Sequence, residues 1–274
     1  MSPLWRDRLQ VFLAPGRVDL ARLQKGIKPR QAARLAAACK QKPGLPAWEA
    51  PLEQFEQMIE NAGGADMSIT LSNAFVRYVV LTAQPSIATP AELHAYAAFQ
   101  MREVFGERAA AWDISVSSWD PCSGGICAAV ERSFLERLGE VSARGKARVK
   151  YVEPYLTGAF DHWHKRFNKS RTWFALLETG RLCLALVENG AWQRISNQRI
   201  VHGAEDELIA ALHQDAILFS VHKEADETVY LFAPEHPEFT LPEDCGWRLA
   251  HLQTESMPAP PHYPTMAEIG AGAA

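Results

Sequence analysis

Hydrophobic and polar residues follow the same order of predicted elements twice along the chain. In the first half, the alternating or continuous apolar runs predict strands at 8–14, 18–24, 33–39, 67–71 and 75–82. Apolar residues at helical spacing predict a helix over 47–61, which Gly63-Gly64 ends. Between the first two strands, Pro15-Gly16 predicts a type II turn.

The second half repeats this order from residue 173 onward. Strands are predicted at 173–177, 182–188, 191–200, 229–233 and 247–252, with a helix over 205–219. Asn189-Gly190 predicts a type I′ hairpin, because both central residues of that turn have positive φ. A strand-turn-strand-strand-helix-strand unit that occurs twice is typical of a duplicated ribonuclease-H-like fold, the actin-like α/β architecture. Two unrelated α/β pieces are the alternative.

A block with its own pattern lies between the two halves. Thr89-Pro90-Ala91-Glu92 is a capping box with proline at the first helical position, and a hairpin and a second helix follow it. The segment 146–153 and a helix at 155–167 lead back to the main body. The expected segments are a first half at 8–88, an inserted α+β subdomain at 89–145, a return helix with the second half at 146–253, and a disordered tail at 254–274.

Composition excludes several classes of protein. Hydrophobic residues make up 47% and charged residues 22%, and the net charge of -4 gives no basic excess for a nucleic-acid partner. We expect no signal peptide and no membrane span, because no apolar run approaches the roughly 20 residues that a span needs. Five cysteines, an odd and sparse set, favour a reducing compartment.

No metal site is expected. Cys122 and Cys127 flank a predicted turn and could approach each other, but no second cysteine pair or nearby histidine completes a zinc site. His162 and His164 stand two residues apart on a predicted helix, so their side chains point to different faces.

Two segments carry a resemblance to a known family. They are Ser-Asn-Ala-Phe-Val-Arg-Tyr at 72–78 and Leu-Glu-Thr-Gly-Arg-Leu-Cys-Leu-Ala-Leu-Val-Glu-Asn-Gly at 177–190. With the element order over 8–252, they resemble the PilM family of type IV pilus assembly and its relatives MshI and the cytoplasmic part of GspL. The resemblance implies an actin-like body with a small subdomain inserted in its first half.

The same resemblance implies three nucleotide-binding loops, and the chain departs from the pattern in each. The first loop should carry Asp-x-Gly, but no acid precedes Gly16, and Pro15 has no N–H to offer a phosphate. In the second, Glu178-Thr179-Gly180 matches with a longer acid, or else Glu178 only ends an exposed hairpin. The third should offer Gly-Gly, but 233–236 reads Ala-Pro-Glu-His.

A pseudo-ATPase is therefore predicted, with no catalytic residue and no cofactor, and with ATP binding not expected. Its vestigial nucleotide-binding residues are Gly16, Arg17, Glu178, Thr179 and Gly180. The enzymatic alternative is a weak ATPase or a small-molecule kinase on the same fold, which would use Glu178 and take Asp161 as its base.

The resemblance further implies a non-enzymatic scaffold that lies at the inner face of the cytoplasmic membrane without a transmembrane segment of its own. A PilN-like membrane protein would recruit it by placing a short cytoplasmic peptide in a groove beside the inserted subdomain. Phe75, Arg77 and Tyr78 are the predicted partner-binding residues, or they belong to an ordinary strand that alternates core and solvent faces. A type II secretion platform component is a further alternative.

Overall fold

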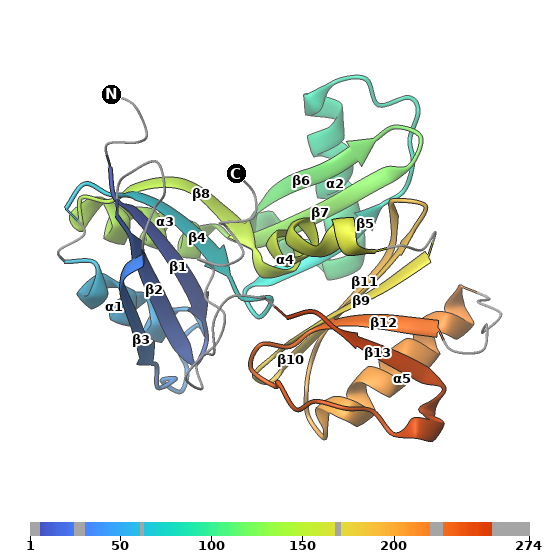
Figure 1. Ribbon diagram of the computed structural model, residues 1–274. Helices are drawn as coiled ribbons and strands as arrows, with labels where there is room; N and C mark the ends of the chain where they lie inside the picture. Colours follow the sequence, from blue (N-terminus) through green and yellow to red (C-terminus); the bar gives the residue numbers. More distant parts are fainter. Residues whose placement is uncertain (1–5, 25–30, 61–62, 168–170, 220–226, 254–274) are drawn as a thin grey trace. The chain divides into compact units, whose positions relative to one another are not determined.

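The structure, a computed structural model, describes residues 6–24, 31–60, 63–167, 171–219 and 227–253 (Figure 1). The chain forms two compact units: unit 1 contains the described residues of 1–76 and 130–162, and unit 2 contains those of 77–129 and 163–263. The predicted tail at 254–274 lies outside the described residues. Among the described helices, none is long and apolar enough to cross a membrane.

Unit 1 is built on a five-stranded sheet in the order β3-β2-β1-β4-β8. Its strands are β1 (Arg8–Ala14), β2 (Arg17–Leu23), β3 (Gln31–Ala38), β4 (Asp66–Leu71) and β8 (Arg148–Pro154). The first three are antiparallel neighbours, whereas β4 runs parallel to β1 and β8 runs parallel to β4. Helices α1 (Glu49–Met58) and α3 (Arg132–Arg144) contact the sheet and each other. They bury a core that includes Phe55 and Phe134.

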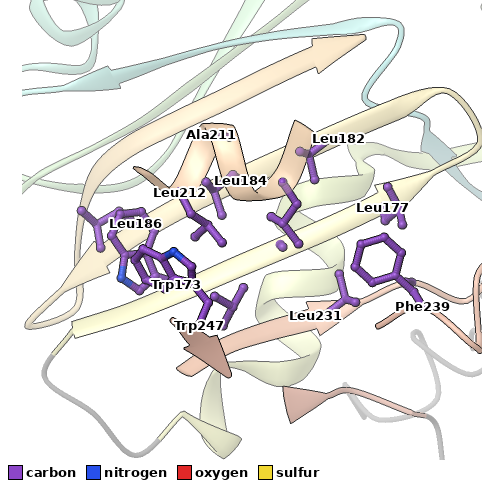
Figure 2. Packing of buried hydrophobic residues seen from close by; sticks show 14 residues of the cluster. Trp173, Leu177, Leu182, Leu184, Leu186, Ala211, Leu212, Leu231, Phe239 and Trp247 are labelled. Carbon is purple, nitrogen blue, oxygen red and sulfur yellow. The ribbon is translucent and has the colours of Figure 1, made fainter. Parts of the chain in front are cut away.

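Unit 2 contains a second five-stranded sheet, in the order β11-β10-β9-β12-β13. Its strands are β9 (Arg171–Glu178), β10 (Arg181–Glu188), β11 (Ala191–Arg199), β12 (Glu227–Phe232) and β13 (Trp247–His251). Figure 2 shows the core that these strands form with α5 (Ala204–Leu218), where Trp173 and Trp247 pack edge to face with ring centroids 5.5 Å apart. All residues from Thr172 to Glu178 on β9 are buried, as expected for a central strand covered on both faces.

The two sheets confirm the predicted duplication. Each begins with three antiparallel strands, and a helix then leads to two further strands that run parallel to the first. The hairpins also correspond: Ala14 faces Arg17 in unit 1, and Glu178 faces Arg181 in unit 2. The residues at the equivalent hairpin positions can therefore be compared directly.

The inserted block contains different elements from those predicted. Strand β5 (Val76–Leu81) does not join the sheet of unit 1 but forms a separate sheet, β5-β7-β6, with β6 (Trp112–Asp120) and β7 (Gly124–Glu131). Helix α2 (Pro90–Phe105) packs on this small sheet through Ala97 and Met101, and a short 3-10 helix, Gly106–Ala111, follows it.

The C-terminal end of the inserted block also differs from the prediction. The helix expected at its end is α3, which packs on α1 in unit 1. The segment 146–153, expected only to lead back to the main body, contains most of β8, the fifth strand of the first sheet. Apolar alternation identifies a strand but not its neighbour, because partner choice depends on long-range packing.

The backbone conformation can be compared with three predicted short motifs. The capping box at α2 is present, with Thr89 Oγ1 accepting from the Glu92 N–H and the Glu92 carboxylate accepting from the Thr89 N–H. Asn189 and Gly190 have φ of 51° and 81°, as the predicted type I′ turn requires. The type II turn at Pro15-Gly16 is wrong, because Gly16 is not among the glycines with positive φ.

Candidate functional site

The first predicted nucleotide loop is the β1–β2 turn of unit 1. Its two carbonyl groups are engaged by one neighbouring segment: the Cys39 N–H donates to Gly16 O at 2.8 Å, and the Gln41 side-chain amide donates to Pro15 O. The nearby acid, Asp19, lies within β2, is 5% exposed and sits 3.0 Å from the Arg17 guanidinium. This carboxylate is therefore paired with Arg17 of the same strand.

The second and third predicted loops are joined by one carboxylate in unit 2. Glu235, in the segment that follows β12, accepts a hydrogen bond from the Thr179 N–H at 2.7 Å, and the Thr179 hydroxyl donates to the same oxygen. In an actin-like ATPase, backbone N–H groups of such a turn would bind phosphate oxygens. Here an internal carboxylate already uses the Thr179 donors.

Glu178 and Arg181 close the same hairpin. They face each other across β9 and β10, and Arg181 also faces Arg199 of β11. Glu178 is 3% exposed, Arg181 is half-buried and Arg199 is exposed. Burial lowers the pKa of Arg181, and the charges of Arg77 and Arg199 lower it further, whereas Glu178 opposes them. Glu178 does end β9 at an exposed turn, Thr179-Gly180, but its own side chain is buried.

A further carboxylate, not singled out from the sequence, lies at the carboxyl end of β8. The Thr70 hydroxyl donates to Glu153 Oε1 at 3.2 Å, and a Cβ on Gly158 would lie 3.3 Å from the Glu153 carboxyl, so a larger residue there would crowd this group. Burial raises the pKa of Glu153; the Thr70 hydrogen bond lowers it, and the charge of Asp161 raises it.

The neighbouring ends of β4 and β8 are fastened by buried Asn73, whose side-chain oxygen accepts from the Leu156 N–H at 3.2 Å. This end of the unit 1 sheet is polar, and ligands of α/β proteins collect at the carboxyl ends of parallel strands. The sequence offered one signal for this site, which is that Glu153 stands just before the predicted helix at 155–167.

The three predicted partner-binding residues are placed differently from one another. Phe75 is 8% exposed and packs edge-on against Phe134, with ring centroids 5.2 Å apart. Tyr78 is 6% exposed, and Arg77 is half-buried. Of the three, Arg77 presents the most surface. Phe75 lies in the turn before β5 and Tyr78 lies within β5, and both aromatic side chains are buried.

The cysteines and histidines form no metal site within the described ranges, where no group of three or more potential ligands was found. All five cysteines are free; Cys122 is exposed and Cys127 is buried. Burial raises the pKa of Cys127 to about 12, so this thiol stays protonated and behaves as a small apolar side chain.

Comparison with known proteins defines the class of fold. The structure is similar to the cytoplasmic domain of EpsL, an inner-membrane component of the type II secretion system of Vibrio cholerae, with a TM-score of 0.61, 12% identity and coverage of 97% of this chain and 94% of that one. It is also similar to the PilM–PilN type IV pilus biogenesis complex, with a TM-score of 0.59, 12% identity and coverage of 82% and 81%.

A third similar structure is a Bacteroides thetaiotaomicron protein of unknown function with an actin-like ATPase fold, with a TM-score of 0.56, 9% identity and coverage of 84% and 82%. No family model and no curated protein matches the sequence. This chain is an α/β protein with the actin-like ATPase fold, similar in fold to PilM and to the cytoplasmic domain of EpsL.

Proposed function

We propose that this chain is a non-enzymatic assembly component of a type IV pilus or type II secretion machine, which binds a cytoplasmic segment of an inner-membrane protein. The observation that carries the proposal is the correspondence in fold, over most of both chains, with two proteins of such machines. In this proposal the chain works at the cytoplasmic face of the inner membrane, and a PilN-like protein is the partner.

The state of the three loops agrees with a scaffold better than with an ATPase. The first turn lacks an acid that could hold a metal ion's water shell, and the Thr179 donors of the second are taken by Glu235. We infer that the nucleotide chemistry of the fold has been lost and that the remaining role is protein binding.

A weak ATPase or small-molecule kinase is the second candidate, and Glu153 is what favours it. A half-buried carboxyl group with a raised pKa beside Asp161 has the character of a general base, which works best when its pKa approaches the working pH. Asp161 alone, the base considered from the sequence, is exposed on α4 (Tyr155–Trp163).

Calorimetry with Mg-ATP separates the two candidates. The scaffold proposal expects no saturable binding up to about 1 mM nucleotide, which corresponds to a binding free energy weaker than roughly -4 kcal/mol. A micromolar dissociation constant that Glu178→Ala weakens, or turnover that Glu153→Gln abolishes, would instead establish the enzymatic candidate.

The partner is tested by co-purification with candidate inner-membrane pilus or secretion proteins, followed by titration of their cytoplasmic peptides. Arg77→Gln is the suitable variant, because Phe75→Ala would open a cavity beside Phe134 and destabilise the fold itself. Weaker binding by Arg77→Gln, with an effect that fades as salt rises, is expected if the peptide is acidic. Failure to bind any inner-membrane pilus or secretion protein would reject the scaffold role.

A further inference from the structure

Four cationic side chains gather around one carboxylate at the amino end of the unit 1 sheet. Strands β1, β4 and β8 are neighbours in this sheet (Figure 1), and their first residues, Arg8, Asp66 and Arg148, are in register. Residues in register project from the same face of a sheet. Two more cations approach the same carboxylate, Arg6 at 3.8 Å and Lys150 at 3.5 Å. Positive charge is therefore concentrated at this end of the sheet.

This charge is not balanced within the described part of the chain. Asp66 is shared by two of the cations, and no described carboxylate lies within ion-pair distance of the Arg8 or Arg148 guanidinium. The neighbouring Asp7 pairs with Arg22, which adds no net charge. A positive patch is thus present on unit 1 although the whole chain has a net charge of -4.

The cationic groups are accessible to a partner. Arg8, Arg148 and Lys150 are exposed, and the Arg6 side chain is 36% exposed. Neighbouring strands lie about 4.8 Å apart, so Arg8 and Arg148, which are two strands apart, are separated by about 10 Å. Cations spread over the face of a sheet at this spacing suit a surface with many separate anionic groups better than one small anion.

Exposed apolar groups accompany the cations. Tyr151 of β8 is in register with Ser68, which stands two residues after Asp66 on β4 and so lies on the same face. Tyr151 is 51% exposed, and the next residue of this edge strand, Val152, is 37% exposed. Tyrosine is enriched at membrane–water interfaces, where its ring and its hydroxyl are both accommodated. An aliphatic side chain also suits lipid, whereas it offers no stacking to a nucleic-acid base.

We propose that this end of the unit 1 sheet, with Arg6, Arg8, Arg148, Lys150 and Tyr151, binds the anionic surface of a membrane. The proposal rests on the scaffold function, in which the chain works at the cytoplasmic face of the inner membrane, and adds a lipid contact to the protein contact. Lipid phosphates pair with the guanidinium and ammonium groups, and the Tyr151 ring lies among the headgroups.

Co-sedimentation of the full chain with lipid vesicles at low salt tests the proposal. One set of vesicles is phosphatidylcholine alone, and the other is an equimolar mixture of phosphatidylcholine and phosphatidylglycerol. Binding is expected only to the anionic set. Arg8→Gln and Arg148→Gln should each weaken it about fivefold, because each cation near an anionic membrane surface contributes about that factor. Both arginines are exposed and outside the ion pairs of the described residues, so the double variant keeps the fold.

Two further variants sharpen the test. The double variant Arg102→Gln, Arg108→Gln is the matched control, because both arginines are exposed in unit 2 and the change in net charge is equal. Its effect should stay below about twofold. Tyr151→Ser keeps every charge and should weaken binding to anionic vesicles severalfold.

Four results would each overturn the proposal. They are equal binding to both sets of vesicles, unchanged affinity of the Arg8→Gln, Arg148→Gln variant, equal weakening by the control variant, and tighter binding of duplex DNA than of anionic vesicles. Binding to anionic vesicles should also disappear at 1 M salt, where the Debye length is about 3 Å.

The co-purification with membrane proteins keeps this inference distinct from the scaffold function. Binding to anionic vesicles without any inner-membrane protein partner would retain the lipid contact and reject the scaffold role. A protein partner that binds the chain, together with no binding to anionic vesicles, would reject the lipid contact and leave the scaffold role standing.

Discussion

The two five-stranded sheets of this protein have the same topology but have kept different chemistry. In unit 1 the carboxyl ends of the parallel strands remain polar, with Thr70 and Glu153 in contact. In unit 2 the corresponding end of β12 is apolar, with Leu231 and Phe232 both buried. A duplicated fold therefore conserves the pattern that makes the sheet, whereas the residues at its strand ends are free to diverge.

The turns that open the two sheets differ as well. Pro15-Gly16 has no glycine-specific conformation, and a Cβ on Gly16 would meet nothing within 4 Å. Thr179-Gly180 has Gly180 at φ 73° and receives a carboxylate from the segment after β12. The first turn has no acid before its glycine, and the second contacts an acid that a distant segment of the chain supplies.

The largest expected difference between the units concerns their second strands. Leu20 and Leu184 are the fourth residues of β2 and β10 and occupy equivalent positions. Leu184 is fully buried within a strand whose residues from Leu182 to Val187 are all buried, whereas Leu20 is 5% exposed. Leu184→Ala should lower the free energy of unfolding by about 2–5 kcal/mol, with Leu20→Ala nearer the lower limit.

Denaturant unfolding of both variants checks this ranking. Equal losses would mean that the two sheets are packed alike in spite of their different burial. If the units unfold separately, two transitions should appear, and each substitution should move only the transition of its own unit.

The two turn glycines offer a smaller contrast. Gly180→Ala places a side chain at positive φ and should cost about 1–2 kcal/mol, whereas Gly16→Ala should change stability by no more than about 0.5 kcal/mol. Thermal unfolding at fixed pH measures both. A larger loss for Gly16→Ala than for Gly180→Ala would show that the first turn needs glycine for a reason other than its backbone conformation.

The smallest expected effect is a pH dependence that belongs to unit 1. The pKa of Glu153 is raised in the folded protein, so the native state holds this proton more tightly than the unfolded chain. Its contribution to stability is therefore present at low pH and is lost as pH rises from the ordinary glutamate range through the raised pKa.

Glu153→Gln removes that titration. We expect the variant to lose less stability than the wild type as pH is increased over this window, and to differ little from it below the window. Unfolding temperatures of both proteins between pH 4 and 8 make the comparison. Parallel curves would mean that the Glu153 carboxyl titrates alike in the folded and unfolded chains.

The sequence by itself determined most of the local structure of both units, apart from the type of the Pro15-Gly16 turn. Apolar periodicity located the strands of the two sheets, and Asn189-Gly190 fixed a type I′ turn, because these signals depend on residues close together in the chain. The missing acid before Gly16 could also be read directly. The predicted actin-like fold is confirmed by the duplicated sheets and by the similar structures.

Only the tertiary structure decided which distant residues meet. Thr70 and Glu153 are 83 residues apart in the sequence, and Thr179 and Glu235 are 56 residues apart, so no local sequence pattern predicts either contact. The pairing of β5 with β7 and the burial of Phe75 against Phe134 likewise depend on long-range packing. Periodicity specifies which face of a helix or strand is apolar. Burying that face against any of several neighbours would give a similar gain in free energy, so only the packing of the whole fold selects the actual neighbour.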